Sequence, residues 1–181
     1  MKGIIFTSLL EMMEARNGQE WVDRCLENYQ GMSQGAFTAV GNYDTEELNQ
    51  LVEIFSKNSQ LSIDTLIYEF GQYMLQVFLT KHKIFFDEHS TCFDFLKSVD
   101  NHIHVQVKKL YANANVPKIS AVQLNPNTLK VTYESSRNLS MLAHGLISAA
   151  IKYYRENIVI TEKENKSTEA KTIVYFILKK Q

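Results

Sequence analysis

Two groups of side chains in this sequence have the chemistry to bind a metal and an anion. His102 and His104 lie in a segment with a helical pattern, and a histidine imidazole is a good iron ligand. Further along, Tyr133, Ser135 and Arg137 alternate in a segment with a strand pattern, which places their side chains on one face. Hydroxyls and a guanidinium on one face can bind one anionic ligand. Together they predict a pocket for a ligand that is both metallic and anionic, and haem, an iron porphyrin with propionates, is such a ligand.

Helical phase distinguishes the two histidines. At about 100° per residue, His104 shares its face with Asp100, Val107 and Tyr111, whereas the face of His102 is more polar. An iron ligand must reach a buried and mostly apolar macrocycle, which favours His104. The remaining histidines are isolated in the sequence and are expected to be ordinary surface or core side chains: His82, His89 and His144.

Hydrophobic periodicity predicts that the first part of the chain is mostly helical. Breaks fall at Asn17-Gly18, in a loop over Gly31–Gly41, and at Asn58-Ser59. The predicted helices cover residues 2–16, about 19–29, from a cap at Asp44 or Thr45 to Asn58, and from a cap at Ser62 to about residue 82.

The second part of the chain mixes helices with strands. A short aromatic connection is predicted over 83–90, then helices of roughly 91–98 and 99–112. Alternation after Pro117 predicts a hairpin of strands 118–124 and 128–134, and a helix of about 138–156 and strands 158–161 and 172–178 follow. Residues 162–171 are predicted to be a charged loop or hairpin tip. The sequence therefore predicts an α+β fold, with a mostly helical N-terminal part joined to a C-terminal part that holds an antiparallel sheet.

Composition limits the classes of function. The net charge of -1 lacks the basic surplus of a general nucleic-acid binder. Cys25 and Cys92 are too few for a disulfide framework and lack metal-ligand spacing, so we expect core thiols in a reducing cytoplasm. Glu11 and Glu14 interrupt the first apolar segment, so neither a signal peptide nor a membrane span is expected. We expect a cytoplasmic protein with no membrane and no nucleic-acid partner.

The chain resembles the haem nitric oxide/oxygen binding (H-NOX) domain family, whose signature is a Tyr-x-Ser-x-Arg motif that follows a proximal histidine. The start Met1–Phe6 and the run His104–Tyr111, with Pro117 beyond it, are also similar to the family. This resemblance extends over the whole chain. It implies a single haem-binding domain over residues 1–181, in which a helical distal subdomain (1–62) packs on an α/β proximal subdomain (63–181) and haem b is buried between them.

The resemblance also implies roles for individual residues. His104 matches the proximal iron ligand, in agreement with helical phase, and Tyr133, Ser135 and Arg137 match the residues that hold the propionates. Arg137 suits that role because a guanidinium offers paired donors to a carboxylate. The residues that match those pressing on the porphyrin are Ile5, Phe78 and Pro117.

Donor chemistry at the bound gas predicts which gas is taken. Bound O₂ carries partial negative charge and is stabilised by a hydrogen-bond donor, whereas NO binds ferrous haem well without one. In oxygen-binding relatives a tyrosine, a tryptophan and an asparagine stand at the positions of Leu142, Leu9 and Met74 here. All three residues are apolar in this chain, which predicts a sensor that binds NO and excludes O₂.

The resemblance further implies that NO weakens or breaks the iron–His104 bond and that the subdomains then move. No effector domain is expected after Gln181, so a separate protein, either a histidine kinase or a cyclic-di-GMP enzyme, is the expected partner. Thr161–Lys171 contains neither cysteine nor histidine, so the zinc site of some relatives is not expected. No nucleophile elbow or phosphate loop indicates an enzyme. The alternatives are a haem sensor of O₂, CO or redox state and a haem-free protein-interaction module.

Overall fold

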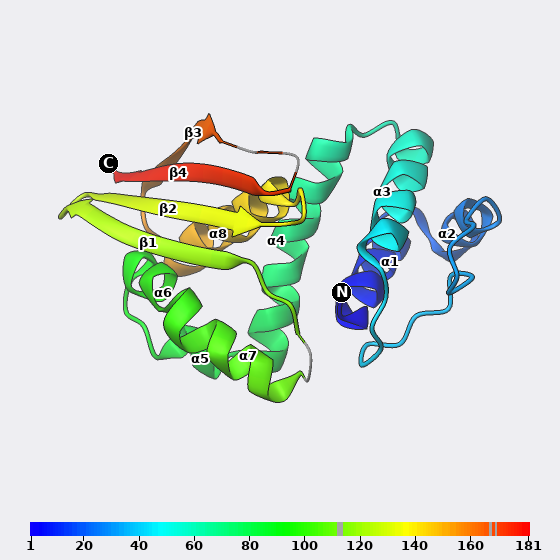
Figure 1. Cartoon of the computed structure of the whole chain (residues 1–181), viewed down its shortest axis with the longest axis horizontal. Helices are drawn as coiled ribbons and strands as arrows, with labels where there is room; N and C mark the ends of the chain where they lie inside the picture. The colour runs from blue at the N-terminus through cyan, green and yellow to red at the C-terminus, as the bar shows by residue number, and fades with distance from the viewer. Residues whose placement is uncertain (112–113, 167, 169) are drawn as a thin grey trace.

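The protein is described by a computed structural model, which covers residues 1–111, 114–166, 168 and 170–181 (Figure 1). Its helices are α1 (Gly3–Asn17), α2 (Gln19–Leu26), α3 (Thr45–Ser59), α4 (Ile63–His82), α5 (Ile84–Asp87), α6 (Cys92–Ser98), a π-helical turn (Val99–Ile103, called the π-turn below), α7 (His104–Leu110) and α8 (Ser140–Tyr154). Its strands are β1 (Lys118–Asn125), β2 (Thr128–Ser135), β3 (Ile158–Asn165) and β4 (Thr172–Lys180). The predicted α+β fold with an antiparallel sheet is confirmed.

Helices α1 to α3 pack together on one side of the long helix α4 (Figure 1). On α1, Phe6, Leu9 and Met13 recur at helical spacing and are fully buried. Helix α2 ends at Leu26 rather than at residue 29, because Tyr29 turns inward and donates a hydrogen bond to the Glu47 carboxylate at 2.6 Å.

The sheet has the strand order β1-β2-β4-β3, and all neighbouring strands are antiparallel. The predicted hairpin of β1 and β2 is confirmed, and the Asn127 N–H donates to the Asn125 side chain at 3.0 Å in its turn. The predicted loop over 162–171 is wrong in its first part, because β3 continues to Asn165. A strand at the edge of a sheet tolerates charged residues, since part of it faces water. Residues 167 and 169, also in that predicted loop, lie outside the described residues.

Two hydrophobic cores meet at α4. Leu66, Phe70 and Met74 belong to the core under α1 to α3, whereas Leu75 belongs to the core between α8 and the sheet. Figure 1 shows α4 standing between these two halves. Because α4 contributes to both cores, the division of the chain at residue 62 remains a proposal.

Helices α4 and α8 cross closely at two glycines. A Cβ atom on Gly71 would lie 2.3 Å from the Leu142 carbonyl oxygen, and one on Gly145 would lie 2.1 Å from the Tyr68 carbonyl oxygen. Only glycine allows this approach, and beside the crossing the Tyr68 hydroxyl donates to Ser148 Oγ at 2.9 Å. The crossing brings Leu142 on α8 close to the α4 backbone. No helix among the described residues is long and apolar enough to cross a membrane.

Candidate functional site

A cavity of about 280 Å³ lies where α1, α4, α6, α7, α8 and β2 converge. Its wall is mostly aliphatic and aromatic. Eight of the ten predicted site residues line it, namely Ile5, Met74, Phe78, His104, Pro117, Tyr133, Arg137 and Leu142. The structure therefore brings together residues that are far apart in the sequence.

His104 is the first residue of α7, and its side chain is only 14% exposed. Its Nδ1 atom is buried, lies 3.5 Å from Asp100 Oδ1, and has no hydrogen-bond partner among the described residues. Burial lowers the pKa of His104, although Asp100 acts in the opposite direction. A neutral imidazole keeps a nitrogen lone pair, which is what a metal needs. His104 therefore combines a position at the cavity wall with a lowered pKa, which favours the neutral imidazole.

His102 lies outside the cavity. Its side chain is 45% exposed, and its Nε2 atom lies 3.2 Å from Glu88 Oε2. Of these two histidines, only His104 lines the cavity among the described residues, and its role as an iron ligand stays a prediction. The continuous α-helix predicted from residue 99 is wrong, however, because the π-turn precedes α7 and the N–H of His104 bonds to the Val99 carbonyl. Residue 112, the predicted end of that helix, lies outside the described residues.

The Tyr-x-Ser-x-Arg segment is folded differently from its prediction as a continuous strand. Strand β2 ends at Ser135, whose Oγ accepts a hydrogen bond from the Arg137 N–H at 3.1 Å and so turns the chain out of the sheet. The Tyr133 hydroxyl donates to the Arg137 carbonyl at 3.0 Å, and burial raises the pKa of Tyr133. Both hydroxyls thus hold the Arg137 backbone, and Arg137 is not on the strand.

Arg137 lines the cavity, and the residue as a whole is half-buried. Its Nη2 donates to the Asn115 carbonyl at 2.5 Å. A guanidinium has five N–H donors, so this single bond leaves it able to pair with a carboxylate. Ser135 is buried but does not line the cavity among the described residues.

The wall formed by Ile5, Met74, Phe78 and Leu142 is apolar. Leu9, which was predicted to share this wall, is fully buried in the core of the helical half and does not line the cavity among the described residues. A helical stripe has a limited width, and Leu9 falls on the part of α1 that faces that core rather than the cavity.

His82 is a cavity residue that sequence reasoning missed. It lines the wall, its Nε2 atom lies 3.3 Å from the Tyr111 hydroxyl, and its ring stacks on Phe85 at 5.7 Å between centres. Burial and, secondly, Lys81 lower the pKa of His82. The spacing Met74, Phe78, His82 is one residue per helical turn and could have identified it.

These features fit the group that the sequence predicts. A buried neutral imidazole can bind a metal, a guanidinium can bind a carboxylate, and the apolar wall between them suits a flat macrocycle. His104 and Arg137 both line the same cavity.

Comparison with known proteins gave concordant results. The family model described as Haem-NO-binding matches residues 2–162. The crystal structure of the Fe(II) unliganded H-NOX protein from K. algicida is 30% identical and superposes with a TM-score of 0.91, covering 100% of this chain and 97% of that one. Its A71G mutant is 31% identical, with a TM-score of 0.92 and the same coverage. An H-NOX protein from S. oneidensis in the Fe(II)NO state, at 24% identity, has a TM-score of 0.90 with 100% and 99% coverage. A search of curated proteins found no match.

Proposed function

Since the chain belongs to the haem-NO-binding (H-NOX) family of haem-based gas sensors, we propose that it binds NO, excludes O₂ and signals to a separate protein. The observation that carries the proposal is one cavity with a mostly apolar wall, which is lined by both His104, whose imidazole is largely buried, and Arg137. In this proposal His104 holds the iron, and Arg137 pairs with a propionate.

Tyr133 and Ser135 support Arg137 indirectly. The Tyr133 hydroxyl donates to the Arg137 carbonyl, and the Ser135 hydroxyl accepts from the Arg137 N–H. Together they fix the backbone position from which the Arg137 side chain extends. Direct contacts from these hydroxyls to the propionates stay a prediction, because Ser135, whose Oγ accepts from the Arg137 N–H, still carries an O–H donor. The proposal therefore assigns the charge to Arg137 and the positioning of its backbone to Tyr133 and Ser135.

The choice of gas follows from the apolar wall. Ile5, Met74, Phe78 and Leu142 have no N–H or O–H in their side chains, so these four residues offer bound O₂ no side-chain donor; His82 and Tyr111, which also line the cavity, bond to each other. NO needs no such donor. Pro117 and Ile5 also line the cavity, where they can press on a macrocycle.

The proposed signal starts at His104. His104 would hold the haem iron, which would supply a ferrous centre able to bind NO, and we propose that the signal is release of the His104 imidazole from that iron. Residues 99–110, all of which the structure describes, are at most partly buried, with Val99 and Ile103 packing against the core, so the π-turn and α7 are held less firmly than α6. Release of His104 would therefore let α7 move against the rest of the molecule, a two-state change that a partner can read.

We propose haem b as the form of the cofactor. Both cysteines are described, both are buried, and neither lines the cavity, so a covalent thioether link has no thiol there. Burial raises the pKa of Cys92 to about 12, which keeps that thiol protonated and unreactive. We further propose a cytoplasmic location, no catalytic activity, and a histidine kinase or cyclic-di-GMP enzyme as the partner.

Absorption spectra of the reduced protein under argon, air, CO and NO test this function. We expect a Soret band under argon, a shifted band under CO and under NO, and the argon spectrum again in air. A stable ferrous-oxy spectrum in air would show an O₂ sensor. The absence of a Soret band in all four gases would indicate a haem-free interaction module.

A further inference from the structure

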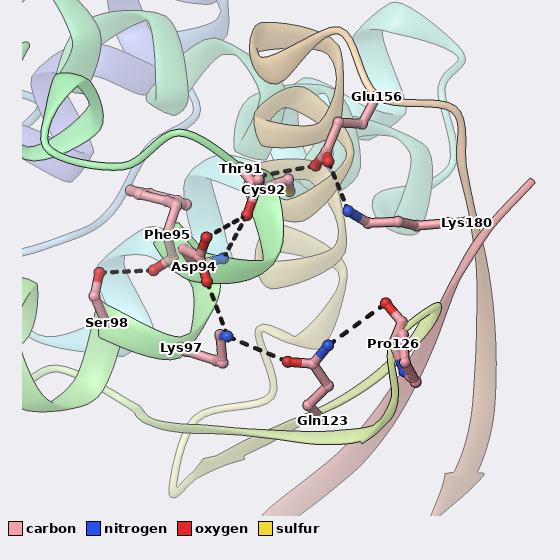
Figure 2. A network of polar contacts seen from close by, with 10 residues as sticks. All are labelled: Thr91, Cys92, Asp94, Phe95, Lys97, Ser98, Gln123, Pro126, Glu156 and Lys180. Carbon is pink, nitrogen blue, oxygen red and sulfur yellow. Dashed lines mark hydrogen bonds and ion pairs between the residues drawn. The ribbon is translucent and has the colours of Figure 1, made fainter.

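The carboxylate of Glu156 joins three elements outside the cavity. Glu156 lies between α8 and β3, and its side chain is 20% exposed. Its Oε2 accepts a hydrogen bond from the Cys92 N–H at 2.8 Å, and its Oε1 accepts one from the Lys180 ammonium at 2.9 Å (Figure 2). The same ammonium lies 4.8 Å from the centre of the Phe93 ring. One side chain thus connects the end of α8, the end of β4 and the start of α6.

This contact satisfies the start of α6. The first N–H groups of a helix have no acceptor within the helix, and a negative charge there is favourable. Thr91 Oγ accepts from the Asp94 N–H at 3.1 Å, while Glu156 accepts from the Cys92 N–H. Thr91 is local in sequence, but Glu156 belongs to a different part of the fold. The start of α6 is therefore held in place by a distant residue.

The other end of α6 is also fixed to the sheet. The Lys97 ammonium donates to Gln123 Oε1 of β1 at 3.2 Å, as Figure 2 shows. Just beyond α6, Asp100 Oδ1 accepts from the Ile119 N–H at 3.4 Å. Between these ends, the apolar face of α6 is buried through Cys92, Phe93, Phe95 and Leu96. Helix α6 is thus anchored along its whole length.

His104 depends on this anchored helix for its position. The chain is helical from Cys92 to Leu110, and beyond α6 its residues 99–110, all described, are at most partly buried, with Val99 and Ile103 packing against the core and Asp100 bonded to β1. At about 1.5 Å per residue, the helical path from Cys92 to His104 is roughly 18 Å long. A tilt of roughly 3° about the start of such a path moves its far end by about 1 Å. A tilt of α6 about its start would therefore displace the His104 imidazole further than it displaces Cys92.

We propose that Glu156 is a positioning residue for His104: by holding the start of α6 against the ends of α8 and β4, it sets the geometry in which His104 meets the iron. This inference rests on the proposed function, in which His104 is the iron ligand. Glu156 itself lies outside the cavity lining of the described residues.

The test uses the haem-loaded ferrous protein without gas, and the variants Glu156→Gln and Glu156→Ala. Glutamine keeps an acceptor for the Cys92 N–H but loses the charge, whereas alanine removes both. Glu69→Gln is the matched control, because Glu69 forms an ion pair with Arg16 and is outside the cavity lining of the described residues. Two quantities are measured in each protein, the iron–histidine stretching band by resonance Raman and the amide hydrogen exchange of α6.

We expect α6 exchange in Glu156→Ala to accelerate about tenfold, which corresponds to ~1.4 kcal/mol for the lost charge-assisted hydrogen bond. The iron–histidine band should shift from its wild-type position in the same variant, with a smaller shift in Glu156→Gln and none in Glu69→Gln. A merely structural role would accelerate exchange and lower the melting temperature without moving the band.

Faster α6 exchange with a wild-type band overturns the proposal, and so does unchanged exchange with an unchanged band. If Glu156→Ala does not fold, Glu156→Gln alone decides by the same criteria. If the wild-type protein shows no iron–histidine band, or if the band persists in His104→Gly, the proposed function fails rather than the role of Glu156.

Discussion

Replacing Arg137 with alanine should accelerate haem loss and leave the fold intact. The hydrogen bonds from Tyr133 and Ser135 go to the backbone of Arg137, so alanine keeps both of them. What alanine loses is the guanidinium, including its bond to the Asn115 carbonyl. The variant therefore removes the Arg137 charge and keeps the turn formed by Tyr133, Ser135 and the Arg137 backbone.

The size of the effect follows from the exposure of the side chain. A hydrogen bond to a charged group contributes about 1.5 to 3 kcal/mol, and the half-buried Arg137 belongs at the lower end because solvent screens it. A loss of about 1.5 kcal/mol corresponds to roughly tenfold faster haem loss. Arg137→Lys should recover only part of this difference, since an ammonium lacks the paired donors of a guanidinium.

The assay is transfer of haem from the protein to an apomyoglobin acceptor in excess, followed by absorbance. Arg24→Ala is the control, because Arg24 is exposed on α2 and does not line the cavity among the described residues. Equal rates of haem loss in Arg137→Ala and Arg24→Ala would refute the assignment of Arg137 to a propionate. A large drop in melting temperature of the haem-free Arg137→Ala protein would refute the claim that the fold does not need the guanidinium.

Three further changes test other parts of the structure. Leu142→Tyr places a hydroxyl at the apolar wall and should slow O₂ dissociation enough for a ferrous-oxy spectrum to appear in air; an unchanged spectrum would contradict the donor argument. Gly145→Ala should lower unfolding free energy by about 1 to 3 kcal/mol in urea titrations, since its Cβ would meet the Tyr68 carbonyl, and a wild-type value would count against the close crossing. Burial raises the pKa of Glu47, but the hydrogen bonds from Tyr29 and Ser33 outweigh burial and lower this pKa below 4.5. The free energy of unfolding should therefore fall as pH drops below about 4.5, and Glu47→Gln should make this fall smaller. An equal fall in melting temperature from pH 6 to pH 3 in the wild-type protein and in Glu47→Gln would contradict this prediction.

Sequence patterns predicted the elements that are stabilised by contacts between residues close in sequence. Helix α4 begins where Ser62 indicates, and its Oγ accepts from the Thr65 N–H at 3.1 Å. The β1–β2 hairpin follows from alternating residues around a turn that Asn125 stabilises. In both cases the decisive hydrogen bond joins residues close in sequence, so the sequence pattern contains it.

The errors occur where distant contacts decide the local structure. The π-turn adds one residue to a helical path, and one extra residue changes the hydrophobic periodicity too little to predict it. Its Asp100 accepts a hydrogen bond from the Ile119 N–H of β1, which is distant in sequence. Arg137 is the exception: it leaves the strand at a hydrogen bond from its N–H to Ser135 Oγ, which is local in sequence, so this turn could have been predicted. His82 was overlooked because only the folded chain brings it beside Tyr111. The site residues could be proposed from their types, but their mutual contacts depend on the packing.

The central claim is that His104 holds the iron, and the Soret spectrum of His104→Gly tests it most directly. His102→Gly is the matched control, since His102 is two residues away, half-exposed and outside the cavity lining of the described residues. We predict that His104→Gly, purified without imidazole, has no Soret band, that added imidazole restores the band, and that His102→Gly keeps a wild-type spectrum. A wild-type Soret band in His104→Gly without imidazole, or its loss in His102→Gly, would contradict the account.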